Sequence, residues 1–139
     1  MIKLKRLRPD VSVPSYATDG ASGLDLHAAV GGTVRPGYPL LVPTGWAIEI
    51  PVGWEGQVRP RSGIASRQHV ATIFGTVDCD YRGEVLVLIA CFGAESYSFA
   101  AGDRIAQLVI APVIKTPVEV VEELSPTARG TGGFGSTGR

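Results

Sequence analysis

The chain has 139 residues, and 13 lysines and arginines balance 13 aspartates and glutamates, so its formal net charge is zero. This balance excludes the broadly basic surface with which proteins bind nucleic acids or anionic membranes through charge alone. The two cysteines, Cys79 and Cys91, exclude a disulfide-rich secreted scaffold and have no metal-ligand spacing. We therefore expect a soluble, cytoplasmic protein with one domain, no membrane-spanning segment and no nucleic-acid partner.

Short apolar runs separated by turn residues predict strands in the first half of the chain. Eighteen glycines and ten prolines leave little room for long helices. The alternation of Ile2 and Leu4 with charged residues predicts a half-buried strand. Residues 34–51 predict strand, turn and strand, with breaks at 36–37 and 44–45.

The second half continues this pattern, with one short helix expected directly after Ser62. The bounded apolar runs 85–90 and 105–110 predict buried strands, and the alternation at Val118 and Val120 predicts a half-buried one. Many short strands without intervening helices are typical of a β-sandwich, jelly roll or barrel. We expect this β domain to span residues 1–124, followed by a flexible, glycine-rich tail over residues 125–139.

Two clusters in the first half hold candidate ligand-binding side chains. In a strand, Asp25 points away from its apolar neighbours, which is also where an ordinary solvent-facing aspartate would lie. Ser62 follows Arg61 at the start of the expected helix. The serine is either the helix N-cap or part of a phosphate-binding segment to which Arg61 adds a bidentate donor.

Two further clusters lie in the segments 75–83 and 101–110. Asp78 and Asp80 share one face of a regular strand, where two carboxylates repel one another and attract a metal ion or a proton. An aspartate- and glycine-rich hairpin turn explains the glycines here but leaves Asp78 and Tyr81 unexplained. Gln107 lies inside an apolar run, so its amide is either paired internally or faces a ligand.

The tail RGTGGFGSTGR cannot pack a core, because five of its residues are glycine. Composition alone favours disorder. The order of the residues suits a lid over a nucleoside phosphate: Ser136 and Thr137 offer hydroxyl donors, and Arg129 and Arg139 neutralise phosphate. Phe134 supplies a ring that can stack on a base.

Together these clusters resemble the five motifs of the homotrimeric deoxyuridine triphosphatases (dUTPases), namely ASGLDL, PRSG, GTVDCDYRGE, GDRIAQLVI and RGTGGFGSTG, in the family's order. The resemblance implies a β jelly-roll (β-clip-like) protomer with one short helix, assembled as a homotrimer with three shared active sites. Each site would take the third motif from one chain, the first, second and fourth from a neighbour, and the fifth from the third chain. The implied reaction is Mg²⁺-dependent hydrolysis of dUTP to dUMP and pyrophosphate, which limits uracil incorporation into DNA and supplies dUMP.

The resemblance also implies a role for each candidate residue. Asp78 would be the general base that activates water, Tyr81 would lie under the deoxyribose and exclude a ribose, and Asp25 would support Mg²⁺ indirectly, through water. The other substrate-binding residues would be Arg61, Ser62, Gly63, Thr72, Gly75, Thr76, Val77, Leu86, Gln107, Arg129, Phe134, Gly135, Ser136 and Thr137.

One departure from the family concerns how the base is read. Many bacterial relatives have an asparagine six residues before the catalytic aspartate, where this chain has Thr72. Other members read uracil with backbone groups, and residues 63–78 are expected to do the same. Two alternatives stay open: an enzyme similar to deoxycytidine triphosphate deaminase, disfavoured by the glycine-rich tail, and a nucleotide-dependent regulatory trimer, disfavoured because Asp78 and Tyr81 are retained.

Overall fold

The computed structural model describes residues 1–133 of the chain. In this range one seven-residue helix accompanies eleven strands, so the predicted all-β fold with one short helix is confirmed. In chain order the elements are β1 (Lys3–Arg6), β2 (Ser15–Tyr16), β3 (Leu24–His27), β4 (Gly32–Val34), β5 (Leu40–Glu49), β6 (Trp54–Arg59), α1 (Ser62–Gln68), β7 (Val70–Thr72), β8 (Gly75–Val77), β9 (Glu84–Cys91), β10 (Tyr97–Phe99) and β11 (Arg104–Pro112). Within the described range no helix is long and apolar enough to cross a bilayer.

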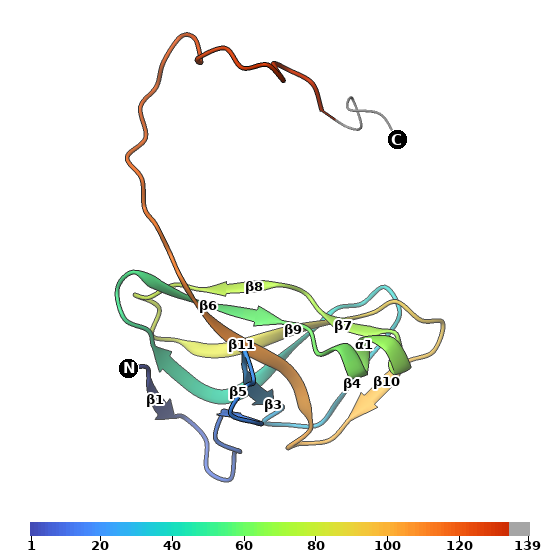
Figure 1. Ribbon diagram of the computed structural model, residues 1–139. Helices are drawn as coiled ribbons and strands as arrows, with labels where there is room; N and C mark the ends of the chain where they lie inside the picture. The colour runs from blue at the N-terminus through green and yellow to red at the C-terminus, as the bar shows by residue number, and fades with distance from the viewer. Residues whose placement is uncertain (134–139) are drawn as a thin grey trace.

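Two antiparallel sheets pack face to face around the core (Figure 1). One sheet has the strand order β1-β5-β9-β7, the other has the order β2-β3-β11-β6-β8, and β10 pairs with β4 in a separate ribbon. Leu26 and Leu108 of one sheet and Ile48, Val87 and Ile89 of the other are fully buried between them. From β5 to β9 successive strands alternate between the two sheets, which is the connectivity of a jelly roll rather than of a simple meander.

Strand β5 runs through residues 44 and 45, where the sequence predicts a break. Gly45 has a φ of +78° and the pairing with β9 shifts register between residues 43 and 47, so this position is a bulge inside one strand. The Thr44 hydroxyl donates to the Val85 carbonyl over 2.7 Å, and the Gly45 amide donates to Glu84 Oε1 over 2.7 Å. The bulge therefore fixes the beginning of β9, next to the third motif.

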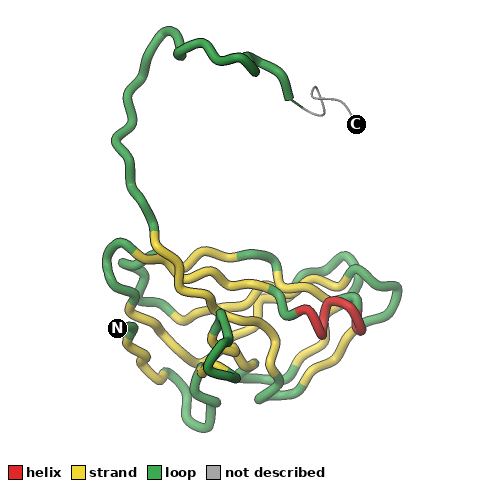
Figure 2. Tube along the Cα trace, in the orientation of Figure 1, coloured by secondary structure: helices red, strands yellow, loops and turns green. Residues whose placement is uncertain are grey.

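The chain leaves the sheets at Pro112, the last residue of β11. Residues 113–133 form an extended segment without helix or strand that runs away from the body (Figures 1 and 2). The strand predicted from Val118 and Val120 is therefore wrong, since these side chains are 92% and 96% exposed. Their alternation finds no neighbouring strand within the described chain, and an unpaired strand is not stable in water.

Candidate active site

A cavity of about 680 Å³ lies between β3, β11 and α1, within the range of about 300–1,000 Å³ that is usual for small-molecule sites. The first, second and fourth motifs meet there. Predicted residues that line this cavity are Asp25, Arg61, Ser62, Gly63 and Gln107. Arg67, Tyr97 and Arg104 line it as well, so three arginines share the cavity wall with the carboxylate of Asp25. This charge distribution suits a polyanionic ligand.

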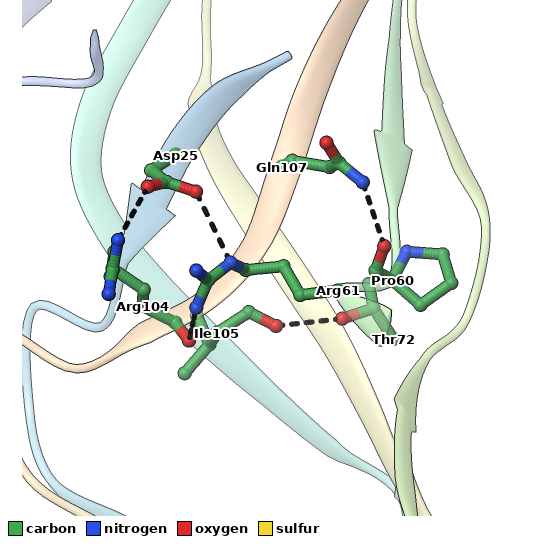
Figure 3. Close-up of polar contacts among 7 residues, drawn as sticks. All are labelled: Asp25, Pro60, Arg61, Thr72, Arg104, Ile105 and Gln107. Atoms are coloured by element: carbon green, nitrogen blue, oxygen red, sulfur yellow. Dashed lines mark hydrogen bonds and ion pairs between the residues drawn. The ribbon is translucent and has the colours of Figure 1, made fainter. Parts of the chain in front are cut away.

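Asp25 lies between two arginines (Figure 3). Its Oδ1 is 3.2 Å from Arg61 Nε, and its Oδ2 is 3.2 Å from Arg104 Nη1. Arg61 also donates from Nη1 to the Arg104 carbonyl over 3.1 Å. The Asp25 side chain is only 13% exposed, so its interpretation as an ordinary solvent-facing aspartate is wrong. This carboxylate fixes the directions of two guanidinium groups at the cavity.

His27 lies on the same face of β3 as Asp25. Partial burial lowers the pKa of His27, because the charged imidazole loses hydration; Asp25 opposes this shift, and Arg104 and Arg61 add to it. Its Nδ1 is buried and has no hydrogen-bond partner among residues 1–133. The imidazole is therefore neutral at pH 7, and the positive charge around the cavity comes from the guanidinium groups.

The Gln107 side chain is both internally paired and part of the cavity wall. Its Nε2 donates to the Pro60 carbonyl over 3.0 Å (Figure 3). The register of β11 places Gln107 opposite Asp25 on β3 and opposite Arg59 on β6. A Cβ at Gly23 would lie 2.9 Å from Gln107 Oε1, so the glycine leaves the space that this amide occupies. The amide is therefore paired internally while it lines the cavity, and its contact with a ligand stays a prediction.

Helix α1 begins at Ser62, but this serine is not its cap. The N-cap position is Arg61, whose backbone is extended and whose side chain makes no capping hydrogen bond. The N-cap interpretation of Ser62 is therefore wrong, and Ser62 and Gly63 instead line the cavity in the first turn, where backbone N–H groups have no intrahelical partner.

Arg67, in the last turn of α1, is a cavity residue that the sequence reasoning missed. It follows Gly63 by four residues, and residues with this spacing are neighbours on a helix surface. A Cβ at Gly63 would lie 3.4 Å from Arg67 Nη2, so the guanidinium group extends along that face. The i, i+4 spacing was the signal that could have identified it.

The third motif gathers around separate cavities. One cavity, of about 200 Å³, is lined by the predicted residues Gly75, Thr76, Val77, Asp78, Tyr81 and Leu86, together with Val58, Glu84 and Val85. Asp78 also lines a cavity of about 350 Å³ with Glu55, Asp80 and Lys115. The Asp78 residue is exposed at the end of β8, so its carboxylate is accessible to water.

Within one chain these two groups of predicted residues do not form a single site. The cavity with the three arginines and the 200 Å³ cavity at Tyr81 share no lining residue. Among the described residues, no arginine lines either cavity at Asp78. A water activated by Asp78 is therefore not held next to the guanidinium groups of the same chain.

Thr72 lines none of these three cavities. The residue is 6% exposed, and its hydroxyl donates to the Ile105 carbonyl over 3.0 Å, which links β7 to β11 (Figure 3). This geometry favours a structural role over the expected contact with the substrate. The departure from the family's asparagine therefore adds a link between the two sheets.

The tail residues are distributed on both sides of the described limit. Arg129 lies in the extended segment, where its Nε donates to the Gly132 carbonyl over 2.7 Å. Phe134, Gly135, Ser136 and Thr137, all predicted to bind substrate, lie outside the described residues.

Among residues 1–133, no three acidic, histidine or cysteine side chains are arranged to hold a metal ion. The donors nevertheless fit Mg²⁺ that arrives with a phosphate substrate, since Mg²⁺ keeps several waters and uses one or two carboxylates with phosphate oxygens. Asp25 is the carboxylate that lines the arginine-rich cavity, and its oxygens retain lone pairs that can accept from water. Asp25 is thus the residue suited to hold the water shell of such an ion.

Comparison with known proteins gives a consistent result along the chain. The dUTPase family model matches residues 10–138. The deoxyuridine 5'-triphosphate nucleotidohydrolase of Anaeromyxobacter sp. (strain Fw109-5) is 54% identical, over 99% of this chain and 97% of that protein. The protein of the same name from Syntrophotalea carbinolica is 51% identical, over 99% of this chain and 96% of its own.

Solved structures agree with the fold. The dUTPase of Staphylococcus bacteriophage 80alpha, determined with dUPNHPP, superposes with a TM-score of 0.90 at 28% sequence identity. The match covers 100% of this chain and 99% of the phage protein. The alternation of strands between two sheets is therefore shared at a low level of sequence identity.

Proposed function

This chain belongs to the dUTPase family and is a dUTP diphosphatase, and we propose that Asp78 activates the attacking water in a site completed by three chains. One observation supports the proposal: three arginines line one cavity together with Asp25, whereas Asp78 and Tyr81 line other cavities. The arginines of the first cavity have the positive charge that a triphosphate needs. In the 200 Å³ cavity, the Tyr81 ring can contact a sugar and the Asp78 carboxylate can bind a water.

The phosphate chain is assigned to the arginine-rich cavity. Arg61, Ser62, Gly63 and Gln107 bind the phosphate oxygens, and Asp25 keeps Arg61 in position through their 3.2 Å ion pair. Bound Mg²⁺ supplies charge neutralisation on the phosphates, with Asp25 supporting its water shell. Positioning and electrostatics provide most of the catalysis in phosphoryl transfer, so this preorganised cluster is the main source of rate.

Asp78 acts as the general base. Its carboxylate accepts a proton from water as the water oxygen bonds to the α-phosphorus. The bond between that phosphorus and the bridging oxygen to the β-phosphate then breaks, which yields dUMP and pyrophosphate. A positioned carboxylate at hydrogen-bond distance from the water is sufficient for this step. The exposure of Asp78 at the end of β8 supports access of that water.

The nucleoside is assigned to the cavity between β8 and the turn that follows it. Tyr81 lies under the deoxyribose and excludes a 2′-hydroxyl by contact. The cavity is also lined by Gly75, Thr76, Val77 and Leu86, and backbone groups of β8 read the uracil edge there. β8 is an edge strand, so it has backbone donors and acceptors that no further strand occupies.

Two exposed apolar surfaces support assembly into a homotrimer. On the outer face of β5 and β9, Leu41 and Leu86 are 54% and 38% exposed, and Phe74 after β7 is 56% exposed. In the extended segment 113–133, Ile114 and Leu124 are 88% and 87% exposed. Exposed apolar side chains on these two parts of the chain are available to pack against partner chains. A threefold arrangement would bury both surfaces and bring Asp78 of one chain to the arginines of the next.

The tail completes the proposal as a lid, with residues 125–139 separate from the catalytic domain of residues 1–124. Arg129, Ser136 and Thr137 bind the terminal phosphate, while Phe134 and Gly135 cover the uracil. The extended segment that leads to the tail leaves the body of its own chain after Pro112, which supports action of the tail on a neighbouring site (Figure 1). The cytoplasmic location expected from the sequence belongs to the same proposal.

Pyrophosphate release from dUTP, dCTP, dTTP and UTP, each with Mg²⁺, tests the activity and its selectivity together. Rapid release from dUTP alone is expected. Silence on all four nucleotides, with dUTP binding detected by calorimetry, would instead identify a nucleotide-dependent regulatory protein. Ammonia release from dCTP would identify a deaminase.

A further inference from the structure

The turn that carries Tyr81 is held by its own hydrogen bonds. The Tyr81 amide donates to the Asp78 carbonyl over 3.1 Å, which closes a β-turn between the third-motif aspartate and the tyrosine. Arg82 Nη1 donates to the carbonyls of Cys79 and Tyr81, each over 2.8 Å. The backbone on the N-terminal side of the ring is therefore fixed.

The ring itself folds back over the residues that follow. Tyr81 Oη donates to the Glu84 carbonyl over 3.0 Å, so the phenol spans Gly83 and reaches the first residue of β9. A Cβ at position 83 would lie against Oη, 2.5 Å from Cζ and 2.9 Å from Cε2. Carbon atoms need about 3.5 Å, so any side chain at position 83 requires the phenol to move by about 1 Å.

The backbone gives no separate reason for a glycine at position 83. Its φ is not among the positive values that require glycine, in contrast to Gly45 or Gly53. The three atoms nearest to a Cβ at position 83 all belong to the phenol of Tyr81, which is therefore the first obstacle that an alanine meets. The Tyr81 ring can therefore occupy its position only because residue 83 has no side chain.

We propose that Gly83 is a positioning residue for sugar selectivity: its missing Cβ lets the Tyr81 phenol lie flat against the backbone, hydrogen-bonded to the Glu84 carbonyl. This inference rests on the proposed role of Tyr81 under the deoxyribose. A ring that is fixed on one face by backbone and at its tip by a hydrogen bond cannot yield to a 2′-hydroxyl. A ring displaced by a Cβ loses both constraints, so a ribose can be accommodated.

Four variants test the proposal through the ratio of kcat/KM for dUTP to kcat/KM for UTP. Gly83→Ala should lower this ratio at least about tenfold, the usual minimum effect of one misplaced group in a fitted pocket. Tyr81→Ala should also lower it. The double variant should match Tyr81→Ala alone, because no ring remains for the added methyl group to displace. Gly20→Ala is the matched control, since its Cβ meets nothing within 4 Å, and should leave the ratio unchanged.

Each outcome separates the inference from the function on which it rests. An unchanged ratio for Gly83→Ala, with a lowered ratio for Tyr81→Ala, would overturn the role of Gly83 and leave the sugar contact intact. An unchanged ratio for Tyr81→Ala would show that neither Tyr81 nor Gly83 determines sugar selectivity. If Gly83→Ala fails to fold while the double variant folds, the contact between ring and backbone is supported. If neither folds, glycine is needed for another reason and the proposal is wrong.

Discussion

Asp25 and Arg61, which lie on different elements, form a 3.2 Å ion pair between Oδ1 and Nε with both side chains largely withdrawn from solvent. The second carboxylate oxygen is 3.2 Å from Arg104 Nη1. One acidic group thus orients two cations that would otherwise repel one another. Removing one partner of such a cluster leaves charge without compensation, and the loss exceeds that at an exposed pair.

Asp25→Asn should lower kcat/KM for dUTP by about 10- to 100-fold, the usual cost of losing a group that orients ligand-binding residues. The amide keeps the shape of the carboxylate but cannot neutralise Arg61 and Arg104. Steady-state kinetics with excess Mg²⁺ measures the effect. Glu49→Gln is the matched control, because Glu49 pairs with Lys3 on the surface and its loss should leave kcat/KM unchanged. Equal values for Asp25→Asn and wild type would show that the arginines hold their positions without the carboxylate.

The strands and the short helix could be predicted because their signals are local. The apolar runs 85–90 and 105–110 lie in β9 and β11, and α1 begins at Ser62, one residue before the expected start. The pairing of Arg104 with Asp25 could not be predicted in this way. It depends on the register of β11 against β3, which shifts between Arg104 and Ala106. A bulge of one residue changes the face of the sheet on which each side chain lies, and the sequence of a single strand does not predict such a bulge.

In the extended segment 113–133, a local sequence signal predicted a strand that the structure does not contain. The alternation at Val118 and Val120 is a local signal for a strand, but pattern alone does not say which chain supplies the neighbouring strand. The division of the site has the same origin. The motifs identify Asp78 and Arg61 as candidates, whereas their location at separate cavities follows from the antiparallel pairing of β6 with β8. The pair Gly56 and Val77 places Asp78 beside the start of β6, whereas Arg61 lies beyond the other end of that strand.

His69→Gly should stabilise the fold by about 1 kcal/mol, because His69 ends α1 in the left-handed conformation, with φ 53° and ψ 35°. The hydrogen bond from the Phe92 amide to the His69 carbonyl is retained in this variant. Denaturant unfolding at one fixed protein concentration measures the change. Ala65→Gly, in the middle of α1, is the control and should destabilise the fold by about 1 kcal/mol. A less stable His69→Gly would show that contacts of the imidazole outweigh the backbone strain.

Removal of residues 129–139 should lower kcat by about 100-fold, the scale of loss when a group that aligns the substrate is missing. The subunit assembly should remain, because the apolar surfaces on β5, β9 and residues 113–124 are retained. Pyrophosphate release and light scattering measure the two properties on the same sample. A truncated protein that is monomeric would show that the tail holds the assembly together, and one with full kcat would remove its role as a lid.

The proposed division of the site between chains predicts that two inactive variants restore each other. Asp78→Asn removes the base, at a cost of about 10²- to 10⁴-fold, and should retain dUTP binding. Arg61→Ala removes the proposed hydrogen-bond donor to the substrate phosphates and the ion-pair partner of Asp25. In a mixed trimer, a site that takes its third motif from an Arg61→Ala chain and its second from an Asp78→Asn chain is wild type at both positions.

Random assembly of equal amounts places this combination at about one quarter of all sites, because each of the two positions is filled independently with a probability of about one half. Co-refolding the two variants should therefore recover about a quarter of wild-type activity, whereas mixing them as assembled proteins should recover none before subunits exchange. If Asp78 and Arg61 acted within one chain, every site would lack one of them, and co-refolding would give no more activity than the separate variants. The cavities at Asp78 contain no arginine among the described residues, so recovery is the expected result.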